Sequence, residues 1–275
     1  MNLSNENVIH IKDKDMEYLQ FRKLLEYPEI KHLYTLGLKK DYRTVRANKE
    51  PLEDHEYKQA VQNYNKLCEK INESHIEIIQ AGQTHSDHVK AIYKKEKQDQ
   101  EKIERSEDTD ALITDQKDII LATTNADCIL LLIFDPIQKV VANVHSGWRG
   151  TLQRISVKTI EKMKKEYNSN PEDIICCICP SIRKCHFEVD REVKDMFENE
   201  FKDIDTHDII EETKKDEKWN IDTVEINKII LQRQGLRKEN IIDSKLCSVC
   251  NKDIIHSFRV EKEGYGVEVA MIKIN

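Results

Sequence analysis

Three side chains that can bind a metal or act as a nucleophile lie beside small or turn-forming residues. Their segments are Gly82-Gln-Thr-His-Ser86, which carries His85, Thr124-Asn-Ala-Asp-Cys128, which ends in Cys128, and His145-Ser-Gly-Trp-Arg-Gly150. Each segment adjoins the end of an expected strand, where a rigid fold meets solvent and functional residues concentrate. His85, Cys128 and His145 are therefore the candidates for a chemical site.

A His/Cys/His set supports two kinds of chemistry. Imidazole and thiolate both bind zinc, and three protein ligands leave a fourth position for water or substrate. Alternatively, Cys128 is a nucleophile and one histidine acts as its base. The third interpretation is a buried structural cysteine with two core histidines. The long spacings match no short metal motif, so the residues alone leave all three interpretations open.

The elements that must position these side chains are strands. The near-continuous apolar runs 119–122 and 129–134 are typical of strands buried on both faces. Residues 139–144 form another apolar run that leads directly into His145. Cys128 and His145 are therefore expected at the ends of strands.

The remaining sequence predicts both helices and strands. The expected elements are a helix over 57–71, a strand over 76–80, a solvated charged hairpin or loop over 94–110, a helix capped by Thr151, a strand over 174–178, helices beginning at Asp190 and Asp222, the latter ended by Gly235, and a C-terminal hairpin with strands 254–260 and 267–274. This mixture predicts an α/β or α+β class and one domain.

Composition excludes several classes of protein. The 275 residues carry a net charge of −7, which argues against a nucleic-acid partner. No apolar run is long enough for a membrane-spanning helix, so no membrane association is expected. The N-terminal residues have no signal-peptide core, which predicts a cytoplasmic protein. Glycine is scarce: only 7 of the 275 residues are glycine, whereas average proteins contain about 7%. Each glycine position is therefore informative.

Most of the eight cysteines are expected to be reduced thiols. Cys176, Cys177 and Cys179 lie on one expected strand, Cys185 follows, and a Cys247-x-x-Cys250 pair comes later. A lone C-x-x-C pair is a weak signal, so these residues are predicted to be small buried thiols and not a second metal site. His186 is given no role.

Several motifs together resemble those of the YfiH or laccase-domain family, whose members are described as polyphenol oxidases, multicopper oxidase-like proteins or zinc-dependent purine nucleoside phosphorylases. The matching segments are Gln83-Thr-His-Ser86, Ala111-Leu-Ile-Thr-Asp115, Thr124-Asn-Ala-Asp-Cys-Ile-Leu-Leu-Leu132, Val144-His-Ser-Gly-Trp-Arg-Gly-Thr151, Cys179-Pro-Ser-Ile182, Cys185-His-Phe-Glu-Val189, Cys247-Ser-Val-Cys-Asn251 and Ser257-Phe-Arg259. The resemblance runs in order from about residue 30 to the C-terminus.

The resemblance implies a fold and a metal site. The fold is α+β, layered α/β/β/α with mixed sheets, in a single domain over residues 30–275 that follows an N-terminal extension, residues 1–29. One zinc is bound by His85, Cys128 and His145, with His85 favoured over the nearby His88. The chain has 10 histidines and no H-x-H pair, so a trinuclear copper centre is not expected. Copper could still compete for the single site.

The resemblance also implies an enzyme that acts on purine nucleosides. The expected reactions are phosphorolysis of adenosine, inosine, guanosine or methylthioadenosine, and hydrolytic deamination of adenosine. The expected partners are thus a small nucleoside and phosphate. The deamination has a physical basis, because zinc lowers the pKa of bound water from about 15.7 toward 7. The alternatives are a cysteine hydrolase or amidase using Cys128 with a histidine, and a non-catalytic metal-binding member.

Two arginines that family members usually carry are missing. The N-terminal arginine with its Gly-Gly turn is replaced by the stretch 34–39, and the C-terminal Gly-Arg pair reads Gly266-Val267. Arginine is the usual bidentate partner of phosphate. We expect Arg149 to take this role, with Arg43 or Arg46 as substitutes; the alternative for Arg149 is a guanidinium packed on Trp148 or paired with a carboxylate. Asp127, next to Cys128, is a candidate proton acceptor or a second partner of the site.

Overall fold

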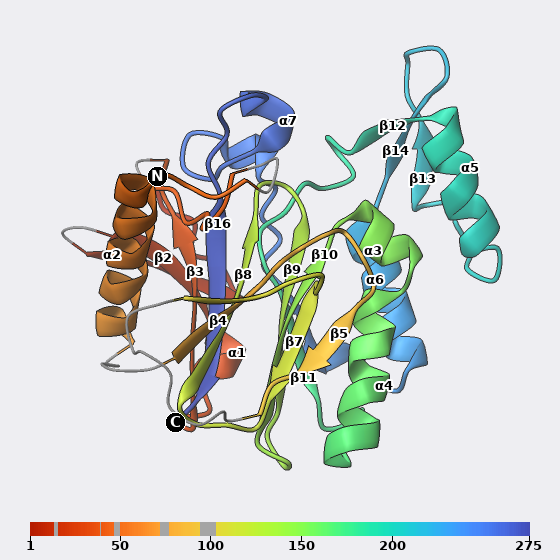
Figure 1. Ribbon diagram of the computed structural model, residues 1–275. Helices are drawn as coiled ribbons and strands as arrows, with labels where there is room; N and C mark the ends of the chain where they lie inside the picture. The colour runs from red at the N-terminus through yellow and green to blue at the C-terminus, as the bar shows by residue number, and fades with distance from the viewer. Residues whose placement is uncertain (14–15, 39, 47–49, 72–76, 94–102) are drawn as a thin grey trace.

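Two β-sheets pack face to face at the centre of the molecule, and helices cover their outer faces (Figure 1). The structure is a computed structural model that describes residues 1–13, 16–38, 40–46, 50–71, 77–93 and 103–275. Helix α2, Asp54–Lys70, lies outside one sheet. Helices α4, Ile155–Tyr167, and α6, Thr223–Arg233, lie outside the other. The predicted α/β/β/α layering is confirmed.

The first central sheet has seven strands. In spatial order they are β1 Val8–Asp13, β2 Met16–Phe21, β3 Ile30–Leu36, β16 Glu268–Ile274, β8 Ile119–Asn125, β4 Glu77–Ala81 and β6 Glu104–Ser106. β4 runs parallel to both of its neighbours, and the other pairs are antiparallel. Residues 1–29 supply β1, β2 and the short helix α1, Arg22–Leu25, so this segment forms one edge of the sheet.

The second central sheet has six strands and also mixes directions. Its spatial order is β15 Ile241–Asp243, β11 Ile175–Ile178, β9 Ile129–Asp135, β10 Val140–Ser146, β7 Ala111–Thr114 and β5 Val89–Ala91. A separate small sheet contains β12 Glu188–Asp190, β14 Lys218–Ile221 and β13 Ile210–Glu212. Helix α5, Arg191–Glu200, packs on the small sheet at one side of the molecule (Figure 1).

Strand β9 shows why its sequence is continuously apolar. Leu130, Leu132 and Phe134 point into the core between the two sheets. Leu131 and Ile133 point to the opposite face, under α4 and α6. Successive side chains of a strand alternate between faces, so a strand covered on both sides is buried at every position, as β9 is. Truncating any of these leucines to alanine would cost about 2–5 kcal/mol of stability.

Helix α6 follows the predicted signals at both ends. The Asp222 carboxylate accepts a hydrogen bond of 2.9 Å from the backbone N–H of Glu225, as an N-cap should. Gly235 has a φ of +102° just after the helix, a conformation that favours glycine. The predicted helix over 57–71 and the strand over 174–178 also form, as α2 and β11.

The predicted C-terminal hairpin is wrong. Residues 254–260 form no strand, and part of this segment is a short helix, α7, Phe258–Glu261. Its first turn is closed by the Glu261 carboxylate, which accepts a 2.6 Å hydrogen bond from the N–H of Ser257. Both edges of β16 are already paired, with β3 and β8, so no edge is left for a hairpin partner.

Two smaller expectations also differ from the structure. Thr151 does not cap a helix but lies within the short helix α3, Trp148–Leu152, which begins after Gly147. Its hydroxyl is already engaged by Ser146 and Asn227. The charged segment expected as a solvated hairpin or loop contains a strand, β6. This strand pairs with β4 and gives it a second neighbour in the sheet. Residues 94–102 of that segment lie outside the described residues.

Candidate metal centre and active site

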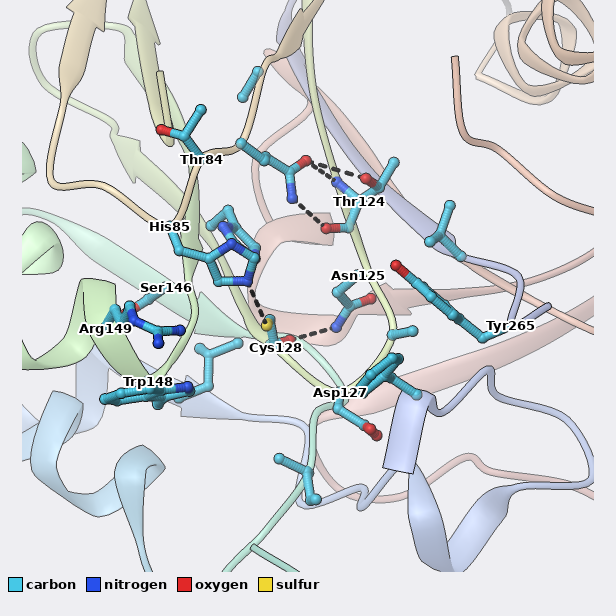
Figure 2. Close-up of a pocket in the computed structure, with 18 of the residues that line it drawn as sticks. Thr84, His85, Thr124, Asn125, Asp127, Cys128, Ser146, Trp148, Arg149 and Tyr265 are labelled. Atoms are coloured by element: carbon cyan, nitrogen blue, oxygen red, sulfur yellow. Dashed lines mark hydrogen bonds between the residues drawn. The ribbon is translucent and has the colours of Figure 1, made fainter. Parts of the chain in front are cut away.

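His85, Cys128 and His145 lie close together, at or beside the ends of strands of the central sheets. Figure 2 shows the imidazole of His85 directed at Cys128. His85 lies on the loop after β4, Cys128 on the turn between β8 and β9, and His145 in β10. Their ligand atoms all lie within 4.8 Å of one another, and His85 Nε2 is 3.8 Å from Cys128 Sγ. A tetrahedral zinc ion holds a nitrogen and a sulfur ligand about 3.6 Å apart. The spacing suits one metal ion.

Asp110, which the sequence motifs did not single out, organises this centre. Its carboxylate lies 2.7 Å from His145 Nδ1 and also accepts the backbone N–H groups of Thr84, His85 and Ser86. An Nδ1–H that donates to a carboxylate leaves Nε2 of the same ring free to bind a metal. Asp110 therefore holds both histidines in place. Its one sequence signal is that it directly precedes the apolar segment that forms β7.

The side-chain amide of Gln83 fastens the His85 loop to β8. It accepts the N–H of Thr124 at 2.8 Å and donates to the carbonyl of the same residue at 2.7 Å (Figure 2). Gln83 and His85 have positive φ angles of 39° and 59°, conformations that non-glycine residues seldom adopt. Such strain collects at functional sites, where the surrounding contacts hold it. The loop is thus fixed two residues before its metal-binding side chain.

Glycine at position 147 lets the helix after β10 approach the centre. A Cβ at Gly147 would lie 2.7 Å from Cδ2 of His85 and 3.3 Å from Sγ of Cys128. The first distance is closer than real Cβ contacts allow. Even alanine at this position would therefore displace the imidazole of His85.

Cys128 and His145 shift each other's pKa values. Burial alone would raise the pKa of the Cys128 thiol, but His145 and His85 outweigh it and lower the pKa to about 6. Burial alone would lower the pKa of His145, but Cys128 and Asp110 raise it to about 9. The thiolate is the form of cysteine that binds a metal and that attacks as a nucleophile. Such shifts, several together in one cleft, mark a functional site.

The centre opens into a pocket of about 680 Å³, within the size range of small-molecule sites. His85, Cys128 and His145 line it together with polar and aromatic side chains. The aromatic side chains are Trp148, Phe187, Phe258 and Tyr265. Phe258 and Tyr265 meet edge to face, with ring centroids 5.1 Å apart. The pocket therefore offers flat apolar surfaces beside the candidate metal ligands.

The three arginines expected as anion partners all line the pocket, but they are engaged differently. Arg149 is exposed, its guanidinium lies 4.1 Å from the centroid of the Trp148 ring, and no ion pair links it to another described residue. Arg46 pairs with carboxylates of Glu53 and Glu56, beside α2. Arg43 pairs with Asp41 and lies 5.0 Å from the ring of Tyr265. Arg149 is thus the most available of the three.

Asp127 lines the same pocket, but its carboxylate points away from Cys128 (Figure 2). One oxygen accepts the Ser248 hydroxyl at 2.5 Å, and the other accepts the backbone N–H of Arg259 at 2.7 Å. The Asp127 carbonyl accepts the N–H of Ile182 at 2.8 Å. Asp127 therefore joins three segments of chain behind the cysteine. His88 is exposed, lies beside Asp108, and is not part of the group.

The other cysteines fall into two sets. Cys176, Cys177 and Cys179 are buried, as predicted. Cys185 and Cys250 are exposed, so their interpretation as buried thiols is wrong. Cys185 lies on a turn and Cys250 in a short helix at the surface, outside the strand that holds the buried Cys176 and Cys177.

Comparison with known proteins agrees with the motifs. A sequence profile of the family described as multi-copper polyphenol oxidoreductase laccase matches residues 46–275. The chain belongs to this family. It is 28% identical over 250 residues to a purine nucleoside phosphorylase of Bacteroides thetaiotaomicron, covering 90% of this chain and 92% of the relative. It is 31% identical over 153 residues to adenosine deaminase RL5 from an unknown prokaryote, covering 56% and 57%.

Solved structures agree with the fold. The hypothetical protein YfiH of Bacillus licheniformis superposes with a TM-score of 0.78, at 22% identity, covering 97% of this chain and 99% of that one. The expected YfiH-like fold is therefore confirmed. Among the described residues, no helix is long and apolar enough to cross a lipid bilayer.

Proposed function

We propose that the protein is a zinc-dependent enzyme that phosphorolyses purine nucleosides. The observation that carries the proposal is the convergence of His85, Cys128 and His145 on one side of a pocket that also presents Arg149 and aromatic rings. Three ligands and an open side are typical of catalytic and not structural zinc sites. The name of the Bacteroides relative, which aligns over 90% of this chain, supports the same reaction.

The three side chains fit zinc. Two imidazole nitrogens and one thiolate suit this ion, and the Asp110 carboxylate behind His145 supplies the partner that metal-binding histidines usually have. When bound, zinc supplies a Lewis acid at the open position of the site. Asp110 is a positioning residue: it holds the His145 ring and the His85 loop in the geometry that the ion requires.

The remaining chemistry belongs to the pocket. Phosphorolysis breaks the bond between N9 of the purine and C1′ of the sugar and forms a bond from C1′ to a phosphate oxygen. The electron pair leaves with the purine, which takes up the proton that hydrogen phosphate gives up. Tyr265 and Trp148 offer faces on which a purine can stack, and Arg149 offers the cation for phosphate. Arg149 then replaces the arginines missing from the family pattern.

Asp127 is proposed to brace the active site and not to transfer a proton. Its two oxygens already accept hydrogen bonds from Ser248 and Arg259, which fix the wall behind Cys128. Arg43 is proposed to orient Tyr265, because its guanidinium lies over that ring.

Adenosine deamination is a second candidate, favoured by the similarity to adenosine deaminase RL5. This reaction uses water, replaces the amino group at C6 with oxygen and releases ammonia. It needs the same pocket and the same open position, but it does not need phosphate.

One set of assays tests these proposals. The purified zinc-loaded protein is incubated with adenosine, inosine, guanosine or methylthioadenosine, with and without phosphate, and the products are separated by chromatography. Free purine formed only with phosphate is expected. Inosine formed from adenosine without phosphate would identify a deaminase. The absence of turnover with all four nucleosides would contradict an enzyme of purine nucleosides.

Cys128 and His85 also form a thiol and imidazole pair, the arrangement of a cysteine hydrolase. Metal removal separates the two chemistries. We expect the apoprotein to lose activity and to regain it with added zinc. Activity that survives metal removal and is lost on alkylation of Cys128 would support the hydrolase instead.

A further inference from the structure

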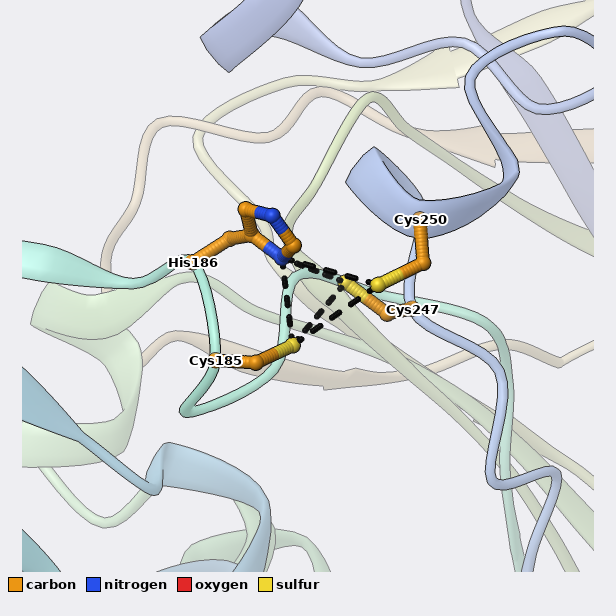
Figure 3. Close-up of side chains that lie close together, drawn as sticks. All are labelled: Cys185, His186, Cys247 and Cys250. Atoms are coloured by element: carbon orange, nitrogen blue, oxygen red, sulfur yellow. Dashed lines mark hydrogen bonds between the residues drawn. The ribbon is translucent and has the colours of Figure 1, made fainter.

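A second group of metal-binding side chains lies outside the active centre: Cys185, His186, Cys247 and Cys250 (Figure 3). Cys185 and His186 lie on the turn between β11 and β12, Cys247 lies just before the short helix η2, Val249–Asn251, and Cys250 lies within it. All four ligand atoms lie within 4.8 Å of one another. Figure 3 shows the three sulfur atoms and the imidazole directed at a common point.

Four of five distances between these atoms lie close to the edges of a tetrahedron around one ion, and the distance from His186 to Cys185 is shorter. Cys185 Sγ lies 3.7 Å from Cys247 Sγ and 3.9 Å from Cys250 Sγ. His186 Nδ1 lies 3.1, 3.7 and 3.6 Å from the sulfurs of Cys185, Cys247 and Cys250. With Zn–S near 2.3 Å and Zn–N near 2.0–2.1 Å, a regular tetrahedron has S···S edges of about 3.8 Å and N···S edges of about 3.6 Å.

The ordinary alternatives do not account for this arrangement. A disulfide needs sulfurs about 2.05 Å apart, and all eight cysteines are free. Packing of small apolar thiols does not account for it either, because Cys185 and Cys250 are exposed. In addition, Nδ1 of His186 lies within 3.7 Å of all three sulfur atoms. Three thiolates and one imidazole are a common ligand set of structural zinc.

Backbone and side-chain contacts hold the two turns together without an ion. Ser181 and Ser248 are linked by a hydrogen bond from the N–H of Ser248 to the Ser181 carbonyl at 3.0 Å. Arg183 Nε donates to the carbonyl of Leu246 at 3.1 Å, and Arg183 also pairs with Asp243 at 2.8 Å. The ligands are therefore presented on a scaffold that is already assembled, which lowers the ordering cost of binding.

We propose that Cys185, His186, Cys247 and Cys250 bind a structural zinc ion. Four protein ligands complete its coordination and leave no position for a substrate, so its role is to fix the two turns. The turns adjoin the pocket wall: Ser248 donates to Asp127, and Arg259 Nη1 donates to the carbonyl of His186 at 3.2 Å. The zinc thus secures the wall behind Cys128. This site does not depend on the proposed function of the pocket.

Zinc stoichiometry tests the site. The full chain is purified under reducing conditions, equilibrated with zinc, freed of excess ion and analysed by mass spectrometry of the metal. We expect two zinc ions per wild-type chain and one in Cys185→Ser and Cys250→Ser. The matched control Cys68→Ser removes a thiol from α2, outside both groups, and should retain two ions.

A second measurement does not rely on the folding of those variants. His85→Ala disables the active centre and leaves the four-ligand site intact. Loaded with cobalt(II), it should show the intense thiolate-to-metal absorption of three sulfur ligands, and X-ray absorption of its zinc form should show about three sulfurs and one nitrogen. A metal-free His85→Ala protein, a disulfide between two of the three cysteines, or iron in place of zinc after equilibration would overturn the proposal.

Discussion

The active centre and the turn site, which is the group of three cysteines and one histidine formed by Cys185, His186, Cys247 and Cys250, use the same kinds of donor atom but differ in their number and in their place in the fold. His85, Cys128 and His145 come from strand ends and the loops beside them, and they open onto a pocket. Cys185, His186, Cys247 and Cys250 come from two turns, and two of the four are exposed. In zinc proteins the number of protein ligands, and not their chemical type, separates a catalytic from a structural ion, and these two groups of residues differ in that number.

The two regions also differ in what supports the ligands. At the active centre the buried carboxylate of Asp110 binds His145 and three N–H groups of the His85 loop, so one side chain positions two ligands. At the turn site the supporting contacts are mainly backbone hydrogen bonds and Arg183. A carboxylate that accepts the second ring N–H of a metal-binding histidine fixes the orientation of that ring, and Asp110 supplies this contact at the active centre.

The largest expected effect separates the two sites by activity. Cys128→Ala should reduce kcat/KM for nucleosides by about 10³-fold or more, because a Lewis acid is worth several kcal/mol. Its melting temperature in the presence of zinc should also fall, because an ion that binds only the folded chain stabilises it. Cys250→Ser should retain activity at low temperature but melt earlier, since a 100-fold weaker zinc site lowers stability by about 2.7 kcal/mol, or about 5–10 °C. Steady-state kinetics and thermal unfolding measure the pair.

The two variants could also behave alike. If Cys250→Ser lost activity as fully as Cys128→Ala at a temperature where it is folded, the turn site would take part in the reaction. Cys68→Ser provides the baseline for replacing a thiol outside both groups.

The grouping of His85, Cys128 and His145 was predictable from the sequence because the three side chains stand in specific motifs beside expected strand ends. Asp110 was missed because its role depends on β7 and β10 being neighbours, which no local pattern reveals. The turn site was dismissed because a lone C-x-x-C pair is a weak signal. The parallel contact between Ser181 and Cys247 brings Cys185 and His186 to that pair from more than 60 residues away.

The fold was predictable where both faces of an element are covered. The continuous apolar run of β9 and the capped helix α6 carry their signals locally. The C-terminal segment 254–260 reads as a strand by its apolar residues, yet β16 has no free edge to receive it. Whether a segment forms a strand depends on which strands of the sheet have a free edge, and the periodicity of one segment carries no information about this.

Chelation should distinguish the two sites because only the active centre, with three protein ligands, leaves a coordination position open. Dipicolinate can bind a zinc ion through an open coordination position, so we expect it to remove the active-centre ion first. All activity should then be lost while about one zinc per chain remains, to be released only by a thiol reagent. Zinc content and activity are followed together over time. Loss of both ions at one rate would contradict the difference in ligand number.

Asp110→Asn should weaken zinc at the active centre alone. Partners of this kind typically contribute 10–100-fold to metal affinity, and asparagine removes the charge while keeping the shape. Competition with a zinc indicator in the Cys250→Ser background measures this site without the other. An unchanged affinity would show that the backbone alone positions His85 and His145.

Arg149→Ala tests the smallest effect, the contribution of one exposed cation in the pocket. A hydrogen bond to a charged group is worth about 1.5 kcal/mol at the low end, so the KM for phosphate should rise about tenfold. The KM for the nucleoside and the zinc content should stay unchanged, and Arg149→Lys should recover part of the loss because it keeps the charge without the bidentate fork. Initial rates at varied phosphate measure this. An equal rise in the KM for nucleoside would instead place Arg149 against the purine, together with Trp148.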